Sequence, residues 1–507
     1  MSLSVANTRA ALGIQAPLVS VEVHLSNGLP ALSLVGLPET TVKEARDRVR
    51  SAIINSGFTF PAKRITVNLA PADLPKEGGR YDLPIAIAIL AASEQIPAAK
   101  LAGYEFLGEL ALNGALRGVQ GAIPAAVAAL DAGRQLILSA DNQSDVGLIQ
   151  HGKSLIASHL LDVCAFLHGK TQLEEAQNNE LVCLPHVAGD LNEIIGQQQA
   201  KRALEVTAAG GHNLLFIGPP GTGKTMLASR LNGLMPPLSD REALESASVA
   251  SLLGSGDLQR QWRQRPFRSP HHSSSLYALV GGGALPKPGE ISLAHNGILF
   301  LDELPEFERR ALDALREPLE SGEISISRAR AKITYPARFQ LIAAMNPSPT
   351  GHYSGQHNRS SPQQTLRYLS RLSGPFLDRF DLSLEVPLLP PGMLSAQHGG
   401  GESSQQVRER VLAARERQLN RCGKVNAVMN NHDIKACCTL TPEDAQWLEQ
   451  VLNQLGLSVR AWQRLLKVAR TIADLAGENE VNREHLTEAV SYRGIDRLLI
   501  HLHNSLQ

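Results

Sequence analysis

A glycine-rich stretch near the middle of the chain has the composition of a phosphate-binding loop. It follows the apolar run 214–217 and reads Gly218, Pro219, Pro220, Gly221, Thr222, Gly223, Lys224, Thr225. Glycines let successive backbone N–H groups converge on an anion, and Lys224 adds a positive charge at the β- and γ-phosphates. The Thr225 hydroxyl is placed to bind Mg²⁺. A turn that binds nothing is the alternative, but a strand pattern before the loop and a helix pattern after it favour nucleotide binding.

Two acids follow a second apolar run, about eighty residues further along the chain. Residues 298–301 are all apolar, which is typical of a strand buried on both faces of a parallel sheet. Asp302 and Glu303 come directly after this run. We expect Asp302 to hold Mg²⁺ and Glu303 to act as the base that polarises the attacking water. Taken alone, two such acids would more often begin a solvated helix, but their position after a phosphate loop in the same domain disfavours that alternative.

Three more polar residues fall where they could contact the same nucleotide. Asn346 ends another apolar run, and its amide could orient the hydrolytic water or contact the γ-phosphate. Arg379 lies at the end of a short helix pattern and could serve as an arginine finger for a neighbouring subunit. Arg460 lies near the start of a long amphipathic helix pattern and could reach the nucleotide from a lid. The alternative for Asn346 is a turn before Pro347, and the alternative for Arg460 is a solvent-facing helix charge.

The order of these motifs resembles that of the AAA+ ATPases, across most of residues 190–495. In that family Asn346 would be the first sensor, Arg379 the finger that acts on a neighbour, and Arg460 the second sensor. The resemblance implies ATP and Mg²⁺ as cofactors. It also implies a ring, usually a homo-hexamer, because a finger of this kind cannot complete its own site.

One branch of that family is indicated by the segments between the phosphate loop and Asp302. The run 265–272, the three glycines 281–283 and the run 286–290 resemble the magnesium-chelatase-like branch, specifically its ComM/YifB group. In this group the insertion faces a central pore. His271 and His272 are adjacent, but no carboxylate or thiolate accompanies them, so we do not expect a metal site there.

The chain departs from that group after Asn346. Many relatives carry four cysteines in this segment, in an arrangement that resembles a zinc clip. Here Ser348 and Thr350 follow, with Ser360 and Ser361 further on, and serine and threonine are poor zinc ligands. We therefore expect no zinc, and we expect the segment to be mobile or stabilised in another way.

A basic hairpin is predicted over residues 322–335. Ile324 and Ile326 alternate with serines, and Arg328, Arg330 and Lys332 fall near the turn. In related ring motors a hairpin at this place grips DNA, and basic tips suit phosphate contacts that do not depend on sequence. A hairpin with merely exposed charges is the alternative.

The first 185 residues have the pattern of a compact α/β unit. Alternation over 19–25 predicts a half-buried strand, and Ser26-Asn27-Gly28 predicts a hairpin turn into a second strand over 29–35. A helix is expected from Thr41 to Gly57, and a further strand over 65–69.

Two segments of this unit resemble Lon-type proteases, which implies a fold like ribosomal S5 domain 2. In residues 73–80, Arg80 stands where that family has its nucleophilic serine, and residues 121–125 lack the expected lysine. A serine–lysine dyad needs both partners, so peptidase chemistry is not expected. We expect a scaffold or a DNA-binding platform, with Lys76, Arg80 and Arg117 as candidate contacts.

Composition places limits on the class of protein. The chain has 507 residues, 49 basic and 49 acidic, so no overall positive charge indicates nucleic acid and any DNA contact must be local. Five cysteines without a CxxC pair suit a reducing compartment. The longest apolar run, 83–92, is too short to cross a bilayer, and no signal peptide is evident. We expect a cytoplasmic protein without membrane contact.

The expected fold class is α/β, with four parts along the chain. These are the Lon-like unit (1–185), an AAA+ core (186–395), a glycine-rich linker (396–404) and a helical lid (405–507). The function that these parts favour is a ring-forming, Mg²⁺- and ATP-dependent motor on single-stranded or branched DNA. The resemblance points to branch migration or helicase activity during recombination of incoming DNA. The alternative is a chelatase-type or chaperone-like motor that remodels a protein partner.

Overall fold

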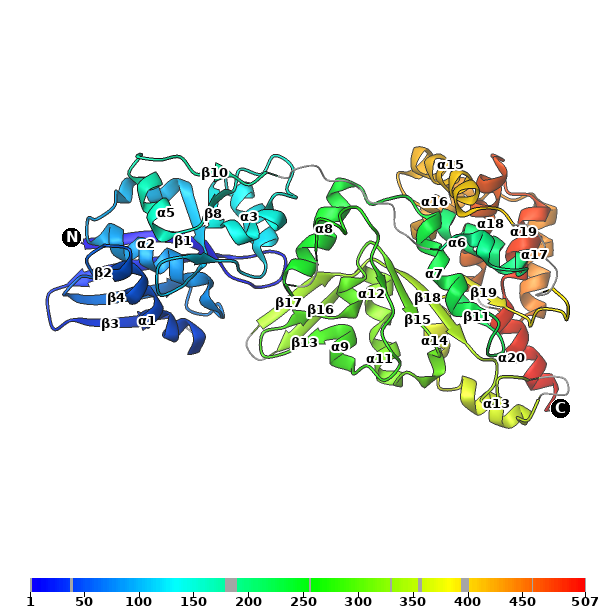
Figure 1. The fold of residues 1–507 in the computed structure, drawn as a ribbon. Coiled ribbons are helices and arrows are strands. Elements are labelled where there is room, and N and C mark those ends of the chain that lie inside the picture. Colours follow the sequence, from blue (N-terminus) through cyan, green and yellow to red (C-terminus); the bar gives the residue numbers. More distant parts are fainter. Residues whose placement is uncertain are drawn as a thin grey trace.

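The computed structural model describes residues 2–36, 40–177, 189–254, 257–328, 331–353, 358–393, 401–457 and 459–506. Figure 1 shows three successive regions along an elongated molecule: a mixed sheet with helices, a parallel sheet with helices, and a cluster of helices at the C-terminal end. No helix in these ranges combines the length and the apolar character needed to span a bilayer.

In the first region, the described residues form an eight-stranded sheet with the order β10-β9-β8-β5-β1-β2-β4-β3. Its helix α2 (Asp82–Ala92) is buried along its whole length, which explains the apolar run at this place in the sequence. The other elements are β1 (Ser2–Arg9), β2 (Leu18–Ser26), β3 (Ala31–Val35), α1 (Thr40–Asn55), β4 (Arg64–Ala70), β5 (Tyr104–Leu107), β6 (Glu109–Leu110), β7 (Leu116–Arg117), α3 (Ala122–Asp131), β8 (Gln135–Ser139), α4 (Gln143–Val146), β9 (Leu155–Ala157), α5 (Leu160–Leu167) and β10 (Glu174–Glu175).

The predicted hairpin at residues 26–28 is wrong. β2 pairs antiparallel with β1 on one edge and with β4 on the other, and β3 adds in parallel to the far edge of β4. The ladders of β2 with β1 and β4 run almost its full length, whereas β3 has only five residues. The longer non-local pairings therefore prevail over the local turn signal.

The second region contains, within the described ranges, a five-stranded parallel sheet with the order β12-β15-β18-β11-β19. Successive residues of these strands face opposite sides, so one face packs against α6 and α7 and the other against α9 and α11. The α/β fold class is confirmed. The elements are α6 (Gln198–Gly210), β11 (Leu214–Ile217), α7 (Lys224–Leu234), α8 (Asp240–Ser251), β12 (Phe267–Arg268), α9 (Leu276–Val280), α10 (Glu290–Leu293), β15 (Ile298–Leu301), α11 (Arg309–Ala314), α12 (Arg316–Ser321), β18 (Gln340–Met345), α13 (Pro362–Leu369), α14 (Gly374–Leu377) and β19 (Leu382–Glu385).

Two small hairpins project from this sheet toward the first region (Figure 1). One consists of β13 (Gly281–Gly282) and β14 (Lys287–Pro288), and the other of β16 (Glu323–Arg328) and β17 (Ala331–Pro336). The second is the predicted basic hairpin. Ile324, Ile326 and Ile333 are buried, which leaves the polar residues on the open side. The Tyr335 hydroxyl donates to the Pro286 carbonyl at 2.7 Å and ties the two hairpins together.

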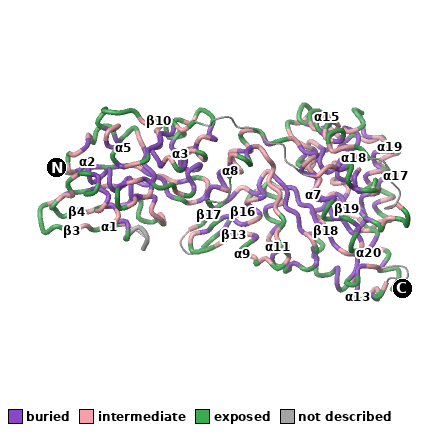
Figure 2. The backbone as a smooth tube through the Cα atoms, viewed as in Figure 1, coloured by how far each residue is buried: buried purple, intermediate pink, exposed green. Residues whose placement is uncertain are grey.

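The first and second regions are joined by a row of small residues. Ala122, Ala125 and Ala126 of α3 pack against Ala243 and Ala247 of α8, so the two helices approach closely. The Gly121 N–H donates to the Ser251 carbonyl at 2.8 Å. In Figure 2, where the tube is coloured by residue burial, buried residues of the first region extend into α3.

The third region is helical. It contains α15 (Ser404–Cys422), α16 (Asn431–Cys437), α17 (Pro442–Gln454), α18 (Val459–Ala476), α19 (Arg483–Ser491) and α20 (Gly494–Asn504), and it shares a core with α6, α7 and one face of the parallel sheet. Most of the predicted linker 396–404 lies outside the described residues, and α15 begins at Ser404.

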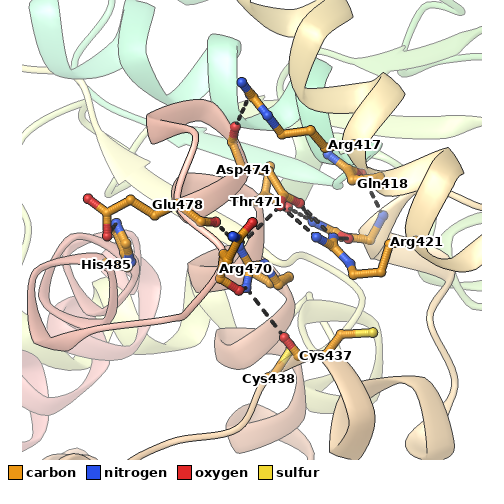
Figure 3. Close-up of polar contacts among 12 residues, drawn as sticks. Arg417, Gln418, Arg421, Cys437, Cys438, Arg470, Thr471, Asp474, Glu478 and His485 are labelled. Carbon is orange, nitrogen blue, oxygen red and sulfur yellow. Dashed lines mark hydrogen bonds and ion pairs between the residues drawn. The ribbon is translucent and has the colours of Figure 1, made fainter.

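A buried acid organises the interior of this region (Figure 3). Both carboxylate oxygens of Asp474 accept hydrogen bonds from Arg421 at 2.8 Å, and Asn426 donates at 2.8 Å. Arg470, which is 1% exposed, lies 3.2 Å from the same carboxylate and also donates to the Asn479 carbonyl. Since every charge here has partners, the network fixes how α15 and α18 meet.

Candidate functional site

The phosphate loop connects the buried strand β11 to α7, as predicted. At Gly218 a side chain is excluded, because a Cβ atom would lie 2.3 Å from the Val386 carbonyl oxygen. Gly221 and Gly223 have φ angles of 81° and 84°, in the left-handed region that glycine adopts without strain. The loop therefore opens at the N-terminus of an eleven-residue helix, where backbone N–H groups favour an anion.

Lys224 occupies this opening. Its ammonium donates to the Gly218 and Pro219 carbonyls at 2.7 and 2.8 Å, and to Asn346 Oδ1 at 3.4 Å. The residue is 8% exposed, and burial lowers the pKa of the ammonium while nearby Asp302 acts in the opposite direction. Hydrogen bonds from an ammonium to charged phosphate oxygens are stronger than those to neutral oxygens, so exchanging these partners for a phosphate lowers the free energy.

Thr225 and Asp302 meet beside the lysine. The Thr225 hydroxyl donates to Asp302 Oδ2 at 2.6 Å, and the other carboxylate oxygen accepts from the Glu303 N–H at 2.9 Å. The sheet register explains the meeting, because β18 lies between β11 and β15 and all three end at the same edge. A hydroxyl and a carboxylate are hard oxygen ligands of the kind that Mg²⁺ requires, so these residues fit that ion.

Glu303 begins the next turn with a φ of 52°, in the left-handed region. Its side chain is 57% exposed, and its Oε2 lies 3.3 Å from His272 Nε2. The two histidines of the sequence stack with ring centroids 4.1 Å apart, and His272 is the one that reaches the acid. The sequence pattern raises these histidines only as metal ligands and does not reveal this contact. The strand before them, β12, has only two residues and is too short to recognise from a pattern.

Arg379 lies at the opposite edge of the sheet. Its carbonyl accepts from Asn213, the residue before β11, whereas the phosphate loop follows the end of that strand. The four residues of β11 span about 13 Å. Arg379 pairs with Glu320, and burial together with Arg316, Arg460 and Arg464 lowers its pKa.

Arg460 stands on the same side as Arg379. Both line a cavity of 1500 Å³ at the amino ends of the strands, together with Arg464 and Asp378. Arg464 donates to Asp378 at 3.1 Å. Within the described residues, Arg379 Nε and Arg464 Nη1 are buried without a hydrogen-bond partner. The structure therefore groups Lys224, Thr225, Asp302, Glu303 and Asn346 at one edge, and the two predicted arginines at the other.

The basic hairpin presents two of its three predicted contacts. Arg328 and Lys332 are exposed, and the Arg328 guanidinium carbon lies 5.2 Å from the Tyr277 ring centroid. Arg330 lies outside the described residues.

Two of the candidate DNA contacts in the first region are wrong. Lys76 is fully buried and donates to the Leu74 and Pro71 carbonyls, and Arg80 is 4% exposed and donates to the Arg9 and Gln120 carbonyls. These cations satisfy carbonyls that the loops leave unpaired, so they are not available to phosphates. Arg117 is exposed and lies 3.5 Å from Glu109.

Hydroxyls form a cluster in the segment after Asn346. Thr350 Oγ1 lies 2.8 Å from Ser360 Oγ and 3.3 Å from Ser348 Oγ, and Ser348 donates to the His352 carbonyl at 2.6 Å. Ser361 caps α13. Residues 354–357 lie outside the described ranges. Hydrogen bonds thus connect the two ends of this segment.

The fold and the site define a class of protein. A parallel sheet with a glycine-rich loop, a lysine, a hydroxyl and two acids at its carboxyl edge, next to a helical cluster, is the arrangement of a P-loop nucleotide-binding protein.

Comparison with known proteins places the chain within that class. Residues 190–394 match the family described as magnesium chelatase, subunit ChlI, residues 21–142 match subunit ChlI of Mg-chelatase, and residues 401–493 match its C-terminal part. The chain is 68% identical to protein YifB of Escherichia coli over the full length of both, and 62% identical to competence protein ComM of Haemophilus influenzae over 99% of this chain and all of that protein. The magnesium-chelatase 38 kDa subunit of Cereibacter sphaeroides is 27% identical over 59% of this chain and 90% of that protein. The chain belongs to the ComM/YifB group of magnesium-chelatase-like proteins.

Proposed function

We propose that this chain is a ring-forming, Mg²⁺- and ATP-dependent DNA motor that drives branch migration during recombination of incoming DNA. The observation that carries the proposal is the division of the catalytic groups between the two edges of one sheet. The phosphate loop and the acids lie at one edge, and Arg379 lies at the other. A head-to-tail ring of six copies would bring the second edge of each subunit to the first edge of the next.

ATPase activity is implied by the family, and each residue has a distinct task in it. Thr225 and Asp302 would hold Mg²⁺, which when bound neutralises charge on the phosphates. Lys224 exchanges its carbonyl partners for phosphate oxygens. Glu303 accepts the proton of the attacking water, and Asn346, 3.4 Å from the lysine, orients that water or the γ-phosphate.

Arg379 and Arg460 complete the neighbour's site. Among the described residues, Nε of Arg379 is buried without a hydrogen-bond partner, and a guanidinium pairs well with an anion such as a phosphate; Arg460 is exposed beside it. Arg379 and Arg460 line the same cavity of 1500 Å³, and in the proposed ring this cavity faces the loop of the next copy.

DNA is proposed as the cargo on two grounds. Arg328 and Lys332 stand exposed at the tip of a hairpin, where two cations suit phosphate contacts. The Haemophilus influenzae relative is named a competence protein, which supports a role with incoming DNA. The first region, 1–185, serves in this proposal as a scaffold beside the core 186–395 and the lid 405–507, in a cytoplasmic homo-hexamer.

We also propose that the segment after Asn346 folds without zinc, since the hydroxyl cluster of Ser348, Thr350 and Ser360 connects its ends. Metal analysis of the purified protein by mass spectrometry tests this point, and one bound zinc per chain would contradict it.

A junction assay tests the function. Purified protein is incubated with ATP, Mg²⁺ and a labelled three-strand or four-way DNA junction at low salt, beside Glu303→Gln. We expect the unaltered protein to resolve the junction and the variant to bind it without resolving it. ATP hydrolysis without binding or resolution of any junction would reject the DNA motor. That outcome would favour a chelatase-type motor on a protein partner, which the likeness to the Cereibacter subunit makes the second candidate.

A further inference from the structure

Asn213 connects the segment that carries Arg379 to the parallel sheet. It stands directly before β11, and its side-chain Nδ2 donates to the Arg379 carbonyl at 2.9 Å. Its side-chain oxygen accepts from the Leu341 N–H of β18 at 2.8 Å. The backbone carbonyl of Asn213 accepts from the N–H groups of Asp381 and Leu382 at 3.0 and 3.1 Å, and its N–H donates to Asp381 Oδ2 at 3.2 Å. One residue therefore joins the starts of β18 and β19 to the residue proposed as the finger.

A buried histidine, His212, connects the same segment to the helical region. Its Nδ1 lies 3.3 Å from Asp381 Oδ2, and its Nε2 lies 2.8 Å from the Thr471 hydroxyl of α18. Figure 3 shows Thr471 within the polar network of that region. Residues 379–382 are therefore connected both to the sheet and to α18, the helix that also carries Arg460.

The backbone of Arg379 lies just after α14, a helix of only four residues. The rings of Phe376 and Phe380 are buried and meet edge-on with centroids 5.7 Å apart, which fixes the path of the chain on both sides of Arg379. Carbonyls at the end of a helix have no partner within that helix. The Asn213 side chain supplies a donor for the Arg379 carbonyl and so fixes its position.

An arginine finger works only when its guanidinium is held within about 0.5 Å of the productive position. An amide suits the support of such a residue, because it offers a donor and an acceptor on one short side chain. We propose that Asn213 is the positioning residue of the finger: it holds Arg379 of one subunit in place for the ATP bound by the next. This inference rests on the proposed function, because it needs Arg379 to act between subunits.

Steady-state ATP hydrolysis by the full-length protein tests the positioning role. Asn213→Leu keeps nearly the same side-chain size and removes both amide hydrogen bonds. We expect kcat to fall about 10²-fold with KM for ATP unchanged, since the finger is displaced while the phosphate loop stays intact. Asn232→Leu is the matched control and should keep the rate of the unaltered protein, because Asn232 also donates from Nδ2 to an arginine carbonyl, that of Arg265, at 2.9 Å. An unchanged kcat in folded Asn213→Leu overturns the inference.

Mixed rings separate a displaced finger from a damaged phosphate loop. Rings of Asn213→Leu with Lys224→Ala should regain activity, because the intact loop of the first variant meets the Arg379 of the second. Rings of Asn213→Leu with Arg379→Ala should regain none, since neither variant supplies a working finger. If Arg379→Ala recovers with Lys224→Ala but Asn213→Leu does not, the positioning role is overturned and the proposed function stands. Recovery of Asn213→Leu with Arg379→Ala overturns it as well.

The double variant Asn213→Leu with Arg379→Ala decides the inference without a mixed ring. If Asn213 acts through Arg379, the double variant hydrolyses ATP as slowly as Arg379→Ala alone, because the finger can be lost only once. A further fall in kcat, or full activity of Arg379→Ala by itself, overturns the inference. If Arg379→Ala and Lys224→Ala fail to restore each other, action between subunits fails, whereas the double variant still decides whether Asn213 acts through Arg379.

Thermal melting checks that each variant is folded. Asn213→Asp replaces Asn213→Leu if the leucine is not accommodated, because aspartate keeps the acceptor for the Leu341 N–H and removes only the donor to Arg379. The same fall in kcat and the same pattern in mixed rings are expected, and an unaltered rate in Asn213→Asp overturns the inference.

Discussion

At the scale of single residues, the site is prepared for a triphosphate before one binds. Lys224 is nearly buried, and within the described ranges its ammonium donates to two backbone carbonyls and one amide oxygen. Thr225 and Asp302 are hydrogen-bonded to each other at 2.6 Å, so a metal ion need only replace that one hydrogen bond. Little reorganisation is required, which lowers the free-energy cost of binding.

Replacing Glu303 with glutamine separates binding from hydrolysis. We expect kcat to fall by about 10²–10⁴-fold, the usual contribution of a general base, with ATP affinity retained. Phosphate release and binding of a fluorescent ATP analogue measure the two properties. Glu306→Gln is the matched control, because Glu306 is a partly exposed acid paired with Arg371. Equal losses in both variants would contradict the role of Glu303.

The Asp474 network predicts a large effect on stability. Asp474→Ala leaves the buried Arg470 and the partly buried Arg421 without their carboxylate, and breaking a buried charge network of this kind costs about 3–5 kcal/mol. Thermal and urea unfolding measure the change. Glu480→Ala, which removes an exposed acid beyond the same helix, should change stability by less than about 0.5 kcal/mol.

At the scale of elements, short segments place the functional groups. The two-residue strand β12 is enough to set His272 beside Glu303, and Tyr277 of α9 lies against Arg328 of the hairpin β16–β17. The hairpin buries Ile324, Ile326 and Ile333, and it leaves Lys332 on the open face while the exposed Arg328 packs on Tyr277 of α9. Short elements of this kind suit binding sites, because their buried side chains fix their position while their exposed side chains can contact a ligand.

The hairpin predicts how DNA binding depends on salt. Arg328→Ala combined with Lys332→Ala should weaken DNA binding and reduce the slope of log affinity against log salt by about 2, since each cation that is removed releases about one counterion fewer from the phosphates. Fluorescence anisotropy over a salt series measures this. Arg367→Ala combined with Lys435→Ala removes the same charges from exposed helical positions. An equal loss of DNA affinity in the control variant would mean that binding depends on the net charge of the protein and not on the hairpin.

At the scale of the whole molecule, the proposed catalytic groups lie at two separate edges of one sheet. The carboxyl edge of the parallel sheet carries the phosphate loop, and the amino edge carries Arg379 and Arg460 beside a wide cavity. A single subunit cannot bring these edges together, because the length of the strands separates them.

Mixing two inactive variants tests this arrangement. Lys224→Ala removes the charge that binds the phosphates, and Arg379→Ala removes the finger, which is worth about 10³–10⁵ in rate in GTPases. Each variant alone should be nearly inactive. Rings assembled from equal amounts of both should regain activity at about one interface in four, where an intact loop meets an intact arginine. No recovery in rings shown by native mass spectrometry to be mixed would contradict action between subunits.

Local chemistry is what the sequence alone determined. Glycines, Lys224 and Thr225 lie in one continuous loop, and Asp302 and Asn346 follow apolar runs that are typical of buried parallel strands, so their meeting was predictable. The tertiary structure decided what depends on pairing between distant segments. It placed β3 on the far edge of β4, directed Lys76 and Arg80 inward to backbone carbonyls, and set His272 against Glu303. The physical reason is that strand register and side-chain burial arise from the sum of many non-local contacts, and no single segment encodes them.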